Sequence, residues 1–459
     1  MKWIELDRFD VGRVWEDALK ILREVGLQVT NEKIAPMVAQ ELEVKEGRIC
    51  FPEEVALRYA DEIRERFGAE SPEPPERISI FSSSLNTHWL DPADGCVKPH
   101  DTQTVIRHTR LIRQLAEEGL SGGGAAGVPQ NVPAEMQFLM THYIDCVYSR
   151  RPGGWGIIQS EAMMRYFLEI AEVMELPKSI GTEMISPLRF MGQSIDLALD
   201  YHDRGMTVGI DPMPILGVTA PADWHMAWAQ SVAENVGSYA LFRTCGVEEI
   251  GCPSFRLFLS NPAAAMTYFS APQHIAALLT RRRIRQFFGL PTLSAELMLV
   301  TSKVPDSQAA MEKMAGCLLG RLFDFPYLEG AGGLWLDEIF SPQQLLIDVE
   351  IKHFVEGIKT DFDETPQDII SVMEEGVRAG GFLAHDLSLD RFREFAWESR
   401  LFDLRPRAAW DGTPQSLLAK ADRIAEEKID AYEYELTGDR RRALDEIVAR
   451  AEREFGGPT

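Results

Sequence analysis

Carboxylates interrupt several apolar runs of this sequence, where an unpaired charge would be costly. Four of them stand inside or directly after such runs: Glu183, Asp211, Glu296 and Glu329. An ionised carboxylate removed from water needs a partner, so each must face a cavity or pair with a basic side chain. We expect Glu296 and Glu329 to face a ligand cavity and act in its chemistry, and Glu183 and Asp211 to contact the ligand. Structural ion pairing is the alternative for each.

Two arginines are candidates to meet a ligand of opposite charge. Arg189 and Arg256 come at or after the ends of apolar runs. A guanidinium can hold a carboxylate through two parallel N–H bonds, and a structural ion pair is the competing interpretation. Ser302 ends another apolar run and is a further candidate for ligand binding. His385 is a candidate too, with helix capping as its alternative.

Aromatic side chains near the ends of the same runs suit a cationic ligand. Trp155, Tyr327 and Trp335 are the candidates. The face of an aromatic ring attracts an alkylated ammonium, which has no N–H group to donate. Packing in the core is the alternative for each ring taken singly. The histidines are too dispersed to predict a metal site, and the cysteines form no CxxC pair.

An alternation of short apolar runs with amphipathic stretches must position these side chains. Strands are expected at 120–128, 153–158, 181–187, 206–216, 249–258, 290–302, 325–335 and 380–384. Helices are expected between them near 133–149, 161–175, 191–204, 222–245, 272–288, 307–323 and 342–358, with a further segment at 366–379. This alternation of strands and helices predicts the α/β class and a (β/α)₈ TIM barrel, in which the active site lies at the carboxyl ends of the strands. A doubly wound sheet is the alternative, but no G-x-G-x-x-G motif supports a dinucleotide site.

The regions outside the barrel are expected to be mostly helical. We place an N-terminal helical region at 1–98, ending in an extended segment from Ile78 to Leu90, the barrel at 99–387, and a C-terminal helical extension at 388–459. The helix expected at 307–323 carries an apolar stripe: Met311, Met314, Leu318 and Leu322. Such a stripe is typical of a helix that covers a sheet.

Composition bounds the class of protein. The 459 residues carry a formal net charge of −24, which argues against binding to nucleic acid. The apolar runs are too short to span a membrane, and the start of the chain lacks a signal-peptide pattern. Scattered cysteines suit the reducing cytoplasm. We expect a cytoplasmic protein of enzyme size.

Several segments together resemble the trimethylamine methyltransferase superfamily. They are PDSQAAME (305–312), GAGG (330–333), SPQQLLIDVEI (341–351), PMPILGVTAPA (212–222) and GGFLAHDLSLDRFREFAWESRLFDLRPRAAW (380–410). In the last segment the family usually has Thr where Asp386 stands. The founding enzyme carries pyrrolysine in the region of 294–302, whereas this chain has only ordinary residues there, so it resembles the non-pyrrolysine branch, which includes glycine betaine methyltransferases.

The resemblance implies a TIM barrel, a homo-oligomer, and methyl transfer to a separate corrinoid (cobalamin) protein, with no cofactor tightly bound to this chain. A small quaternary amine such as glycine betaine is then the expected substrate. Its methyl group needs a strong nucleophile but no general acid, because a neutral amine leaves; the protein mainly orients the methyl group and excludes water. The alternatives are a tertiary amine or methylsulfonium substrate, or a catalytically silent barrel that only binds a quaternary amine.

Overall fold

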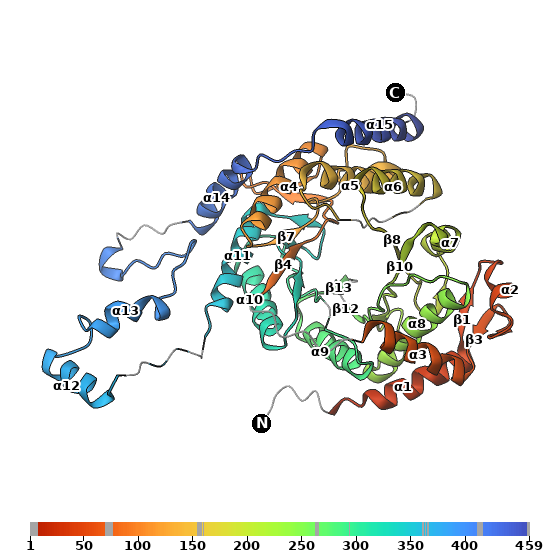
Figure 1. Cartoon of the computed structure of the whole chain (residues 1–459), viewed down its shortest axis with the longest axis horizontal. Helices are drawn as coiled ribbons and strands as arrows, with labels where there is room; N and C mark the ends of the chain where they lie inside the picture. Colours follow the sequence, from red (N-terminus) through yellow and green to blue (C-terminus); the bar gives the residue numbers. More distant parts are fainter. Residues whose placement is uncertain are drawn as a thin grey trace.

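A computed structural model describes residues 8–68, 77–153, 158, 160–261, 266–292, 294–359, 362, 364, 367–410 and 416–456. The fold belongs to the α/β class, with short strands set inside a layer of helices (Figure 1). The helices between the strands are α4 (Thr102–Glu117), α5 (Gln137–Tyr148), α6 (Glu161–Met174), α7 (Gln193–Tyr201), α8 (Trp224–Thr244), α9 (Pro272–Phe287), α10 (Ser307–Leu322) and α11 (Pro342–Glu356). From α5 to α11 their positions confirm the spacing that the sequence predicts.

The parallel strands form two arcs. In one arc β4 (Ser79–Ser82) lies between β7 (Gly122–Gly123) and β14 (Tyr327–Glu329), and Ala295 bridges to Leu328 on the far side of β14. In the other arc β8 (Lys178–Thr182) pairs with β10 (Met206–Ile210), which bridges to Ile250. All these pairings are parallel, so the carboxyl ends of the strands in each arc lie at a common edge.

The strand predictions need correction in several places. The segment 290–302 contributes only isolated bridges at Ala295 and Val300, and residues 154–157 of the strand expected at 153–158 lie outside the described residues. The segment 380–384 forms a turn between two helices and pairs with no described strand, because it lies in a helical hairpin away from the sheet. Its place in the parallel arc is taken by β4, which falls in the region expected to be an N-terminal helical unit. β4 alternates buried and half-buried residues, and its short length leaves a weak sequence signal.

Further short strands lie beside the two arcs, and their pairings are partly parallel and partly antiparallel. β5 (His88–Leu90) and β6 (Val97–Pro99) follow β4, and they join β15 (Gly333–Leu334) and β16 (Ile339–Phe340), which follow β14. After β10 come β11 (Ile215–Leu216), β12 (Phe258–Asn261) and β13 (Met266–Tyr268). In the amino-terminal region β1 (Leu27–Val29), β2 (Glu43–Lys45) and β3 (Arg48–Cys50) form one sheet with β9 (Arg189–Phe190).

The helix α10 covers the sheet with the opposite face to the one that its apolar stripe predicts. Its buried residues are Ala309, Lys313, Gly316, Cys317 and Gly320, whereas Met311 is 67% exposed and Leu322 is 64% exposed. A Cβ atom on Gly316 would lie 1.9 Å from the Leu297 carbonyl oxygen, and one on Gly320 would lie 2.6 Å from the Leu328 side chain. The two glycines let the helix approach the strands closely. Met311 and Leu322, at the ends of the stripe, therefore face outward, whereas Met314 and Leu318 stay half-buried against the core.

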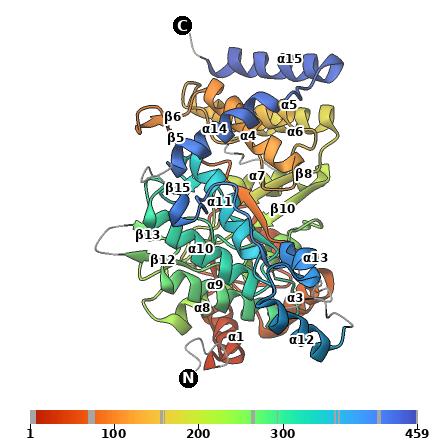
Figure 2. The same ribbon diagram turned by 90° about the vertical axis from the view of Figure 1, so that its left-hand side faces the viewer.

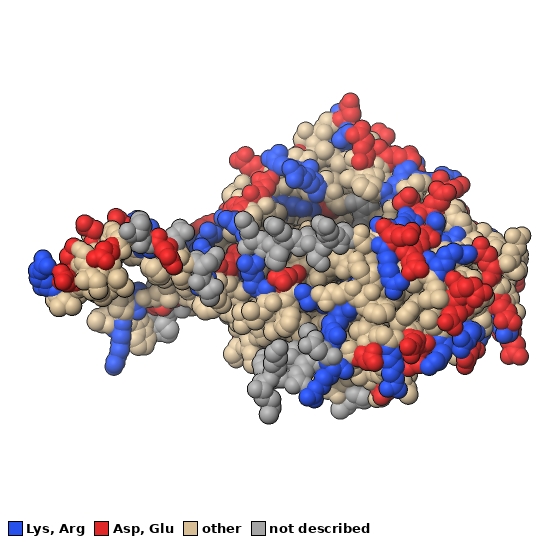
Figure 3. All heavy atoms as spheres, turned by 60° about the horizontal axis from the view of Figure 1, so that its bottom comes forward, with Lys and Arg blue, Asp and Glu red and all other residues tan. Residues whose placement is uncertain are grey.

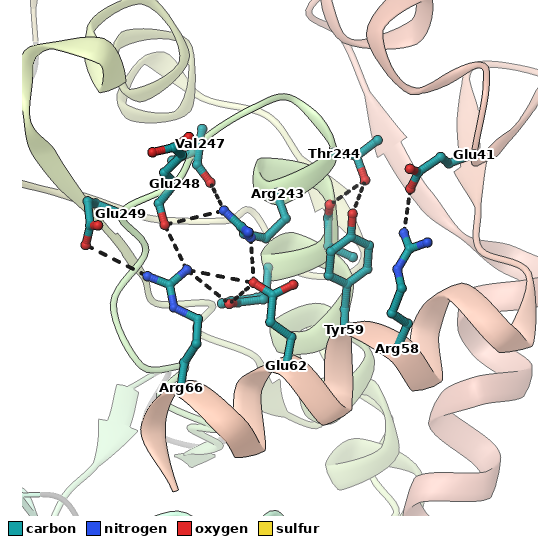
Figure 4. A network of polar contacts seen from close by, with 12 residues as sticks. Glu41, Arg58, Tyr59, Glu62, Arg66, Arg243, Thr244, Val247, Glu248 and Glu249 are labelled. Carbon is teal, nitrogen blue, oxygen red and sulfur yellow. Dashed lines mark hydrogen bonds and ion pairs between the residues drawn. The ribbon is translucent and has the colours of Figure 1, made fainter.

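Polar contacts fasten the amino-terminal helices to α8. The α-helices of the amino-terminal region are α1 (Val11–Lys20), α2 (Ile34–Val38) and α3 (Glu53–Phe67). The Tyr239 hydroxyl of α8 donates to Glu62 over 2.9 Å, and Arg66 donates to the Glu248 carbonyl over 2.8 Å (Figure 4). Buried apolar residues of α1, α3 and α8 form one continuous core, so this region is part of the body of the protein.

The C-terminal helices divide into a packed pair and a projecting pair. α14 (Leu417–Ala431) packs on α4 and α11, and α15 (Gly438–Phe455) packs on α5 and α6. In contrast, α12 (Ile369–Ala379) and α13 (Asp386–Phe395) extend away from the body, at the left of Figure 1. None of the helices described here is both long and apolar enough to cross a membrane.

Candidate active site

A cavity of about 730 Å³ opens at the carboxyl ends of the strands. Its lining includes residues that follow β4 and β7, the last two residues of β8, and the residues directly after β8 and β10. The described lining is Leu85, Thr87, Val128, Gln137, Phe138, Ile158, Gly181, Thr182, Glu183, Gln193, Ser194 and Asp211. Glu183 and Asp211, both expected from the sequence to contact a ligand, are therefore brought together in one cavity. Their carboxylates make this part of the lining acidic.

An ion-pair chain runs from the cavity into the protein. Asp211 pairs with Nη1 of Arg256, and Nε of Arg256 lies 3.0 Å from Oε1 of Glu296. Nη1 of Arg281, from α9, lies 3.3 Å from both carboxylate oxygens of Glu296. Glu296 is only 5% exposed, so the two arginines are what allow its charge to be buried. The carboxylates Asp211 and Glu296 thus share one guanidinium.

The second expected catalytic carboxylate belongs to the same cluster. Burial raises the pKa of the Glu329 carboxyl, and the charge of Glu296 raises it further, while Arg256 and the Ser294 hydroxyl oppose the shift. For Glu296 the balance is reversed: burial alone would raise its pKa, but Arg281 and Arg256 outweigh burial and lower the pKa to about 2. Two neighbouring carboxyls with opposite shifts are a common feature of functional sites, although structural networks produce them too.

The low pKa of Glu296 predicts how acid affects stability. Because the folded-state pKa lies below the ordinary value, the stabilisation by this carboxylate is complete above about pH 4.5 and is lost as the pH falls toward 2. We expect Glu296→Gln to lower the free energy of unfolding at pH 7, and the difference from the unsubstituted protein to shrink on acidification. Urea unfolding at pH 7 and pH 3.5 measures this; an unchanged difference would contradict the assigned ion pairs.

Other expected site residues lie in local structural roles. Arg189, on β9, donates to the Ser186 carbonyl over 3.1 Å. The Ser302 hydroxyl lies 2.9 Å from the Val304 carbonyl oxygen and 3.0 Å from Asp306, the N-cap of α10. His385 caps α13, and its ring accepts from the Leu387 amide over 3.2 Å. It therefore lies in the α12–α13 hairpin that projects from the body.

The expected aromatic cage is not assembled by the rings that the structure describes. Tyr327 begins β14, so it lies at the opposite end of that strand from Glu329, and it packs edge-on against Phe81 at 5.4 Å. The face of Trp335 is already covered by the Lys303 ammonium, 3.7 Å from the ring centroid. Trp155 lies outside the described residues. Neither Tyr327 nor Trp335 lines the cavity.

Sequence reasoning missed several cavity residues and the main cation of the cluster. Phe138 is the aromatic residue among the described lining, with Gln137, Gln193 and Ser194 as hydrogen-bonding neighbours. These residues start the helices after strands, and that position is the signal that could have identified them. Arg281 is hidden within an Arg-rich helix sequence, where nothing distinguishes it from the half-buried Arg282 and Arg283. Among the described residues, no group of three His, Cys, Asp or Glu side chains could hold a metal ion.

The arrangement defines an α/β protein with an acidic cavity at the carboxyl ends of parallel strands, where enzymes of such folds bind their substrates. Comparison with known sequences identifies the family. A family model described as "Trimethylamine methyltransferase (MTTB)" matches residues 5–456, and the chain belongs to this methyltransferase family. The resemblance in the sequence motifs is thereby confirmed.

Individual relatives are distant. Glycine betaine methyltransferase of Desulfitobacterium hafniense (strain Y51) is 21% identical over 431 residues, covering 89% of this chain and 88% of the relative. Trimethylamine methyltransferase MttB1 of Methanosarcina acetivorans is 28% identical over 180 residues, covering 38% of this chain and 36% of the relative. The monomethylamine methyltransferase structure from Methanosarcina barkeri superposes with a TM-score of 0.44 at 9% identity, over 92% of this chain and 87% of that one.

Proposed function

We propose that the protein moves a methyl group from a small quaternary amine, similar to glycine betaine, to the Co(I) of a corrinoid carried by a separate protein. The observation that carries the proposal is the cavity with the carboxylates of Glu183 and Asp211 in its lining. A quaternary ammonium has a permanent charge and no N–H group, so carboxylates and an aromatic face are the groups that attract it. Phe138 supplies such a face.

We also propose that the two arcs of parallel strands are parts of one closed (β/α)₈ barrel, with β4 as first strand and β14 as last. The parallel pairing of β14 with β4 supports closure, since it joins strands from opposite ends of the alternating segment. In a barrel, the loops that line the cavity would all surround one mouth. The corrinoid protein would approach from that side, because the methyl acceptor has to reach the bound substrate.

For this methyl transfer the cavity residues need only bind the substrate and orient its methyl group. The methyl carbon would form a bond to the nucleophilic Co(I), which supplies the electron pair of that bond. The C–N bond breaks and its electron pair stays on nitrogen, so a neutral tertiary amine leaves and no proton moves. Asp211 and Glu183 would hold the ammonium, and Gln137, Gln193 and Ser194 would hydrogen-bond the other end of the substrate. Arg256 is paired with Asp211 and Glu296, so we assign it to holding Asp211 rather than a substrate carboxylate.

The test is a methyl-transfer assay with a Co(I) corrinoid protein. Betaines, carnitine, choline, trimethylamine and a methylsulfonium are each offered as the methyl donor in a separate reaction. Loss of the Co(I) absorption and growth of that of the methylated corrinoid report turnover. Turnover with a quaternary amine alone supports the proposal. Turnover with trimethylamine or the methylsulfonium would move the substrate class to a tertiary amine or a sulfonium. Binding without turnover would favour a silent amine-binding protein.

Removing the charge of Asp211 tests the cavity itself. We expect Asp211→Asn to raise KM for the quaternary amine about tenfold, roughly 1.4 kcal/mol of binding, with a much smaller change in kcat. Asp203→Asn is the matched control, because Asp203 is an exposed carboxylate that does not line the cavity. A KM that is the same for both variants would show that the ammonium binds elsewhere.

A further inference from the structure

The two carboxylates of the cavity lining differ in their partners. Asp211 pairs with Arg256, the guanidinium that it shares with Glu296. Arg281 supplies the second positive charge of this ion-pair chain, which therefore holds two carboxylates and two guanidiniums. The Glu183 carboxylate has no partner among the side chains that the structure describes, and only its backbone amide is engaged. The negative charge of Glu183 is therefore the uncompensated one in the lining.

The same two carboxylates lie at neighbouring positions on adjacent strands. Thr182, the last residue of β8, is paired with Ile210, the last residue of β10, and Glu183 and Asp211 come next. The Asp211 amide donates to the Thr182 carbonyl over 3.1 Å, so the strands are still joined at this position. Adjacent strands lie about 4.8 Å apart. A cation at this edge of the sheet therefore meets both carboxylates.

Buried hydrogen bonds fix the segment that carries Glu183. This segment joins β8 to α7, and Figure 2 shows β8, β10 and α7 side by side. Glu234, a fully buried residue of α8, accepts from the Ser186 hydroxyl and from the Leu188 amide, each over 2.8 Å. The Glu183 amide donates to the Ser194 hydroxyl over 3.4 Å. The backbone of Glu183 is thus held in place before a ligand arrives, and little backbone entropy is lost on binding.

The lining offers no matching positive charge. No lysine, arginine or histidine lies among its described residues. Arg189 and Arg256 are the arginines that the sequence offers for a ligand carboxylate, and both have other partners. Arg189 donates to the Ser186 carbonyl, and Arg256 belongs to the ion-pair chain.

The remaining polar groups of the lining are neutral. Gln137, Gln193 and Ser194 carry amide and hydroxyl groups, which can donate to or accept from a ligand hydroxyl. A ligand carboxylate beside them would share the cavity with the charge of Glu183 and have no cation of its own. Removing such a charge from water without a partner is costly, and the like charges repel.

Charges on the outer surface do not provide the same selection. On the face of the body shown in Figure 3, acidic and basic side chains are interspersed. Exposed charges are also screened over about 10 Å at an ionic strength of about 0.1 M, so they act weakly on a ligand inside the cavity. The two ends of a ligand are therefore distinguished by the lining itself.

We propose that the cavity selects a quaternary amine whose second end is uncharged, such as choline, over a zwitterion such as glycine betaine, and that Glu183 sets this preference. The inference rests on the proposed function and names its substrate class. Both compounds carry the trimethylammonium group from which a methyl group can be transferred. A monocation balances the charge of Glu183, whereas a zwitterion brings a further negative charge into the cavity.

Titration calorimetry of the full chain, without a corrinoid protein, measures the preference directly. Choline is expected to bind at least about tenfold more tightly than glycine betaine. Glu183→Gln is expected to lower the ratio of the two affinities severalfold, and Glu183→Lys to bring it to about one or below. Asp203→Lys is the matched control, because it changes the net charge equally at an exposed carboxylate outside the lining and is expected to keep the ratio.

The methyl-transfer assay with the same two donors separates this inference from the proposed function. Tighter binding of choline with no transfer from either donor would uphold the selection and contradict methyl transfer. Transfer from glycine betaine with a KM at or below that for choline would overturn the selection and leave methyl transfer standing. The selection is equally overturned if the chain binds neither compound, or if Glu183→Lys and Asp203→Lys keep the same ratio of affinities.

Discussion

Lys313→Met is expected to lower the free energy of unfolding by about 3–5 kcal/mol, because it leaves a buried carboxylate without its cation. Lys313 and Asp348 are both fully buried, and Nζ of Lys313 lies 2.8 Å from Oδ2 of Asp348. Burial lowers the pKa of Lys313 and raises that of Asp348, since each charged form loses its water. Each side chain stabilises the charge of the other, so removing either one is costly.

Further hydrogen bonds make this pair a support for the loop after β14. The Lys313 ammonium donates to the carbonyls of Met298 and Gly330, each over 2.9 Å, and Asp348 accepts from the Gly332 amide over 2.7 Å. The pair therefore fixes the turn that directly follows Glu329. We expect Lys313→Met to reduce methyl transfer as well, because Glu329 loses a fixed position.

Urea unfolding at neutral pH measures the expected loss of stability. Arg423→Met is the control, because Arg423 forms an exposed ion pair with Glu427 and such pairs contribute about 0–1 kcal/mol. The double variant Lys313→Met with Asp348→Leu is expected to recover part of the loss, since no unpaired charge remains. A Lys313→Met protein as stable as the Arg423→Met protein would mean that the pair is not formed in solution.

Arg256→Gln is expected to lower kcat/KM for methyl transfer by at least about a hundredfold, the cost of misplacing substrate-binding groups by roughly 1 Å. Arg256 is shared by Asp211 at the cavity and Glu296 beneath it. Without its charge, Asp211 is no longer held toward the cavity, and Arg281 is left as the arginine paired with Glu296. The pKa of Glu296 should then rise from its depressed value.

The kinetic effect must be separated from simple loss of folding. Arg66→Gln is a suitable control, because Arg66 also bonds across two elements but lies in the network between α3 and the segment after α8, which does not line the cavity (Figure 4). Arg256→Lys keeps the charge and is expected to retain more activity than Arg256→Gln. Equal activity of Arg256→Gln and the unsubstituted protein at equal melting temperature would remove Asp211 and its partner from the site.

The helices were more predictable than the strands for a local reason. Periodic apolar residues and N-caps such as Asp306 for α10 and Ser341 for α11 act within one turn, so the sequence marks the boundaries directly. The parallel strands are only two to five residues long, and their pairing joins distant segments. For that reason β4 was expected to be extended chain without a partner, and the turn at 380–384 between α12 and α13 was expected to be a strand.

The candidate site shows the same division. An acidic residue in an apolar run indicates that its charge must be compensated, and this rule selected Glu183, Asp211, Glu296 and Glu329. It cannot tell which arginine provides the compensation, because Arg281 and Glu296 approach only when α9 packs on the strands. Nor can it tell which aromatic rings face the cavity, since that depends on which end of a strand each ring occupies.

By itself the sequence determined the family, the α/β class, the spacing of the helices and the acidic character of the candidate site, since these follow from residue types and from local periodicity. The tertiary structure decided that Asp211 and Glu296 share Arg256, that α10 turns its glycines toward the strands, and that α12 and α13 extend away from the body. These features depend on contacts between residues far apart in the chain, and such contacts exist only after the elements have packed together.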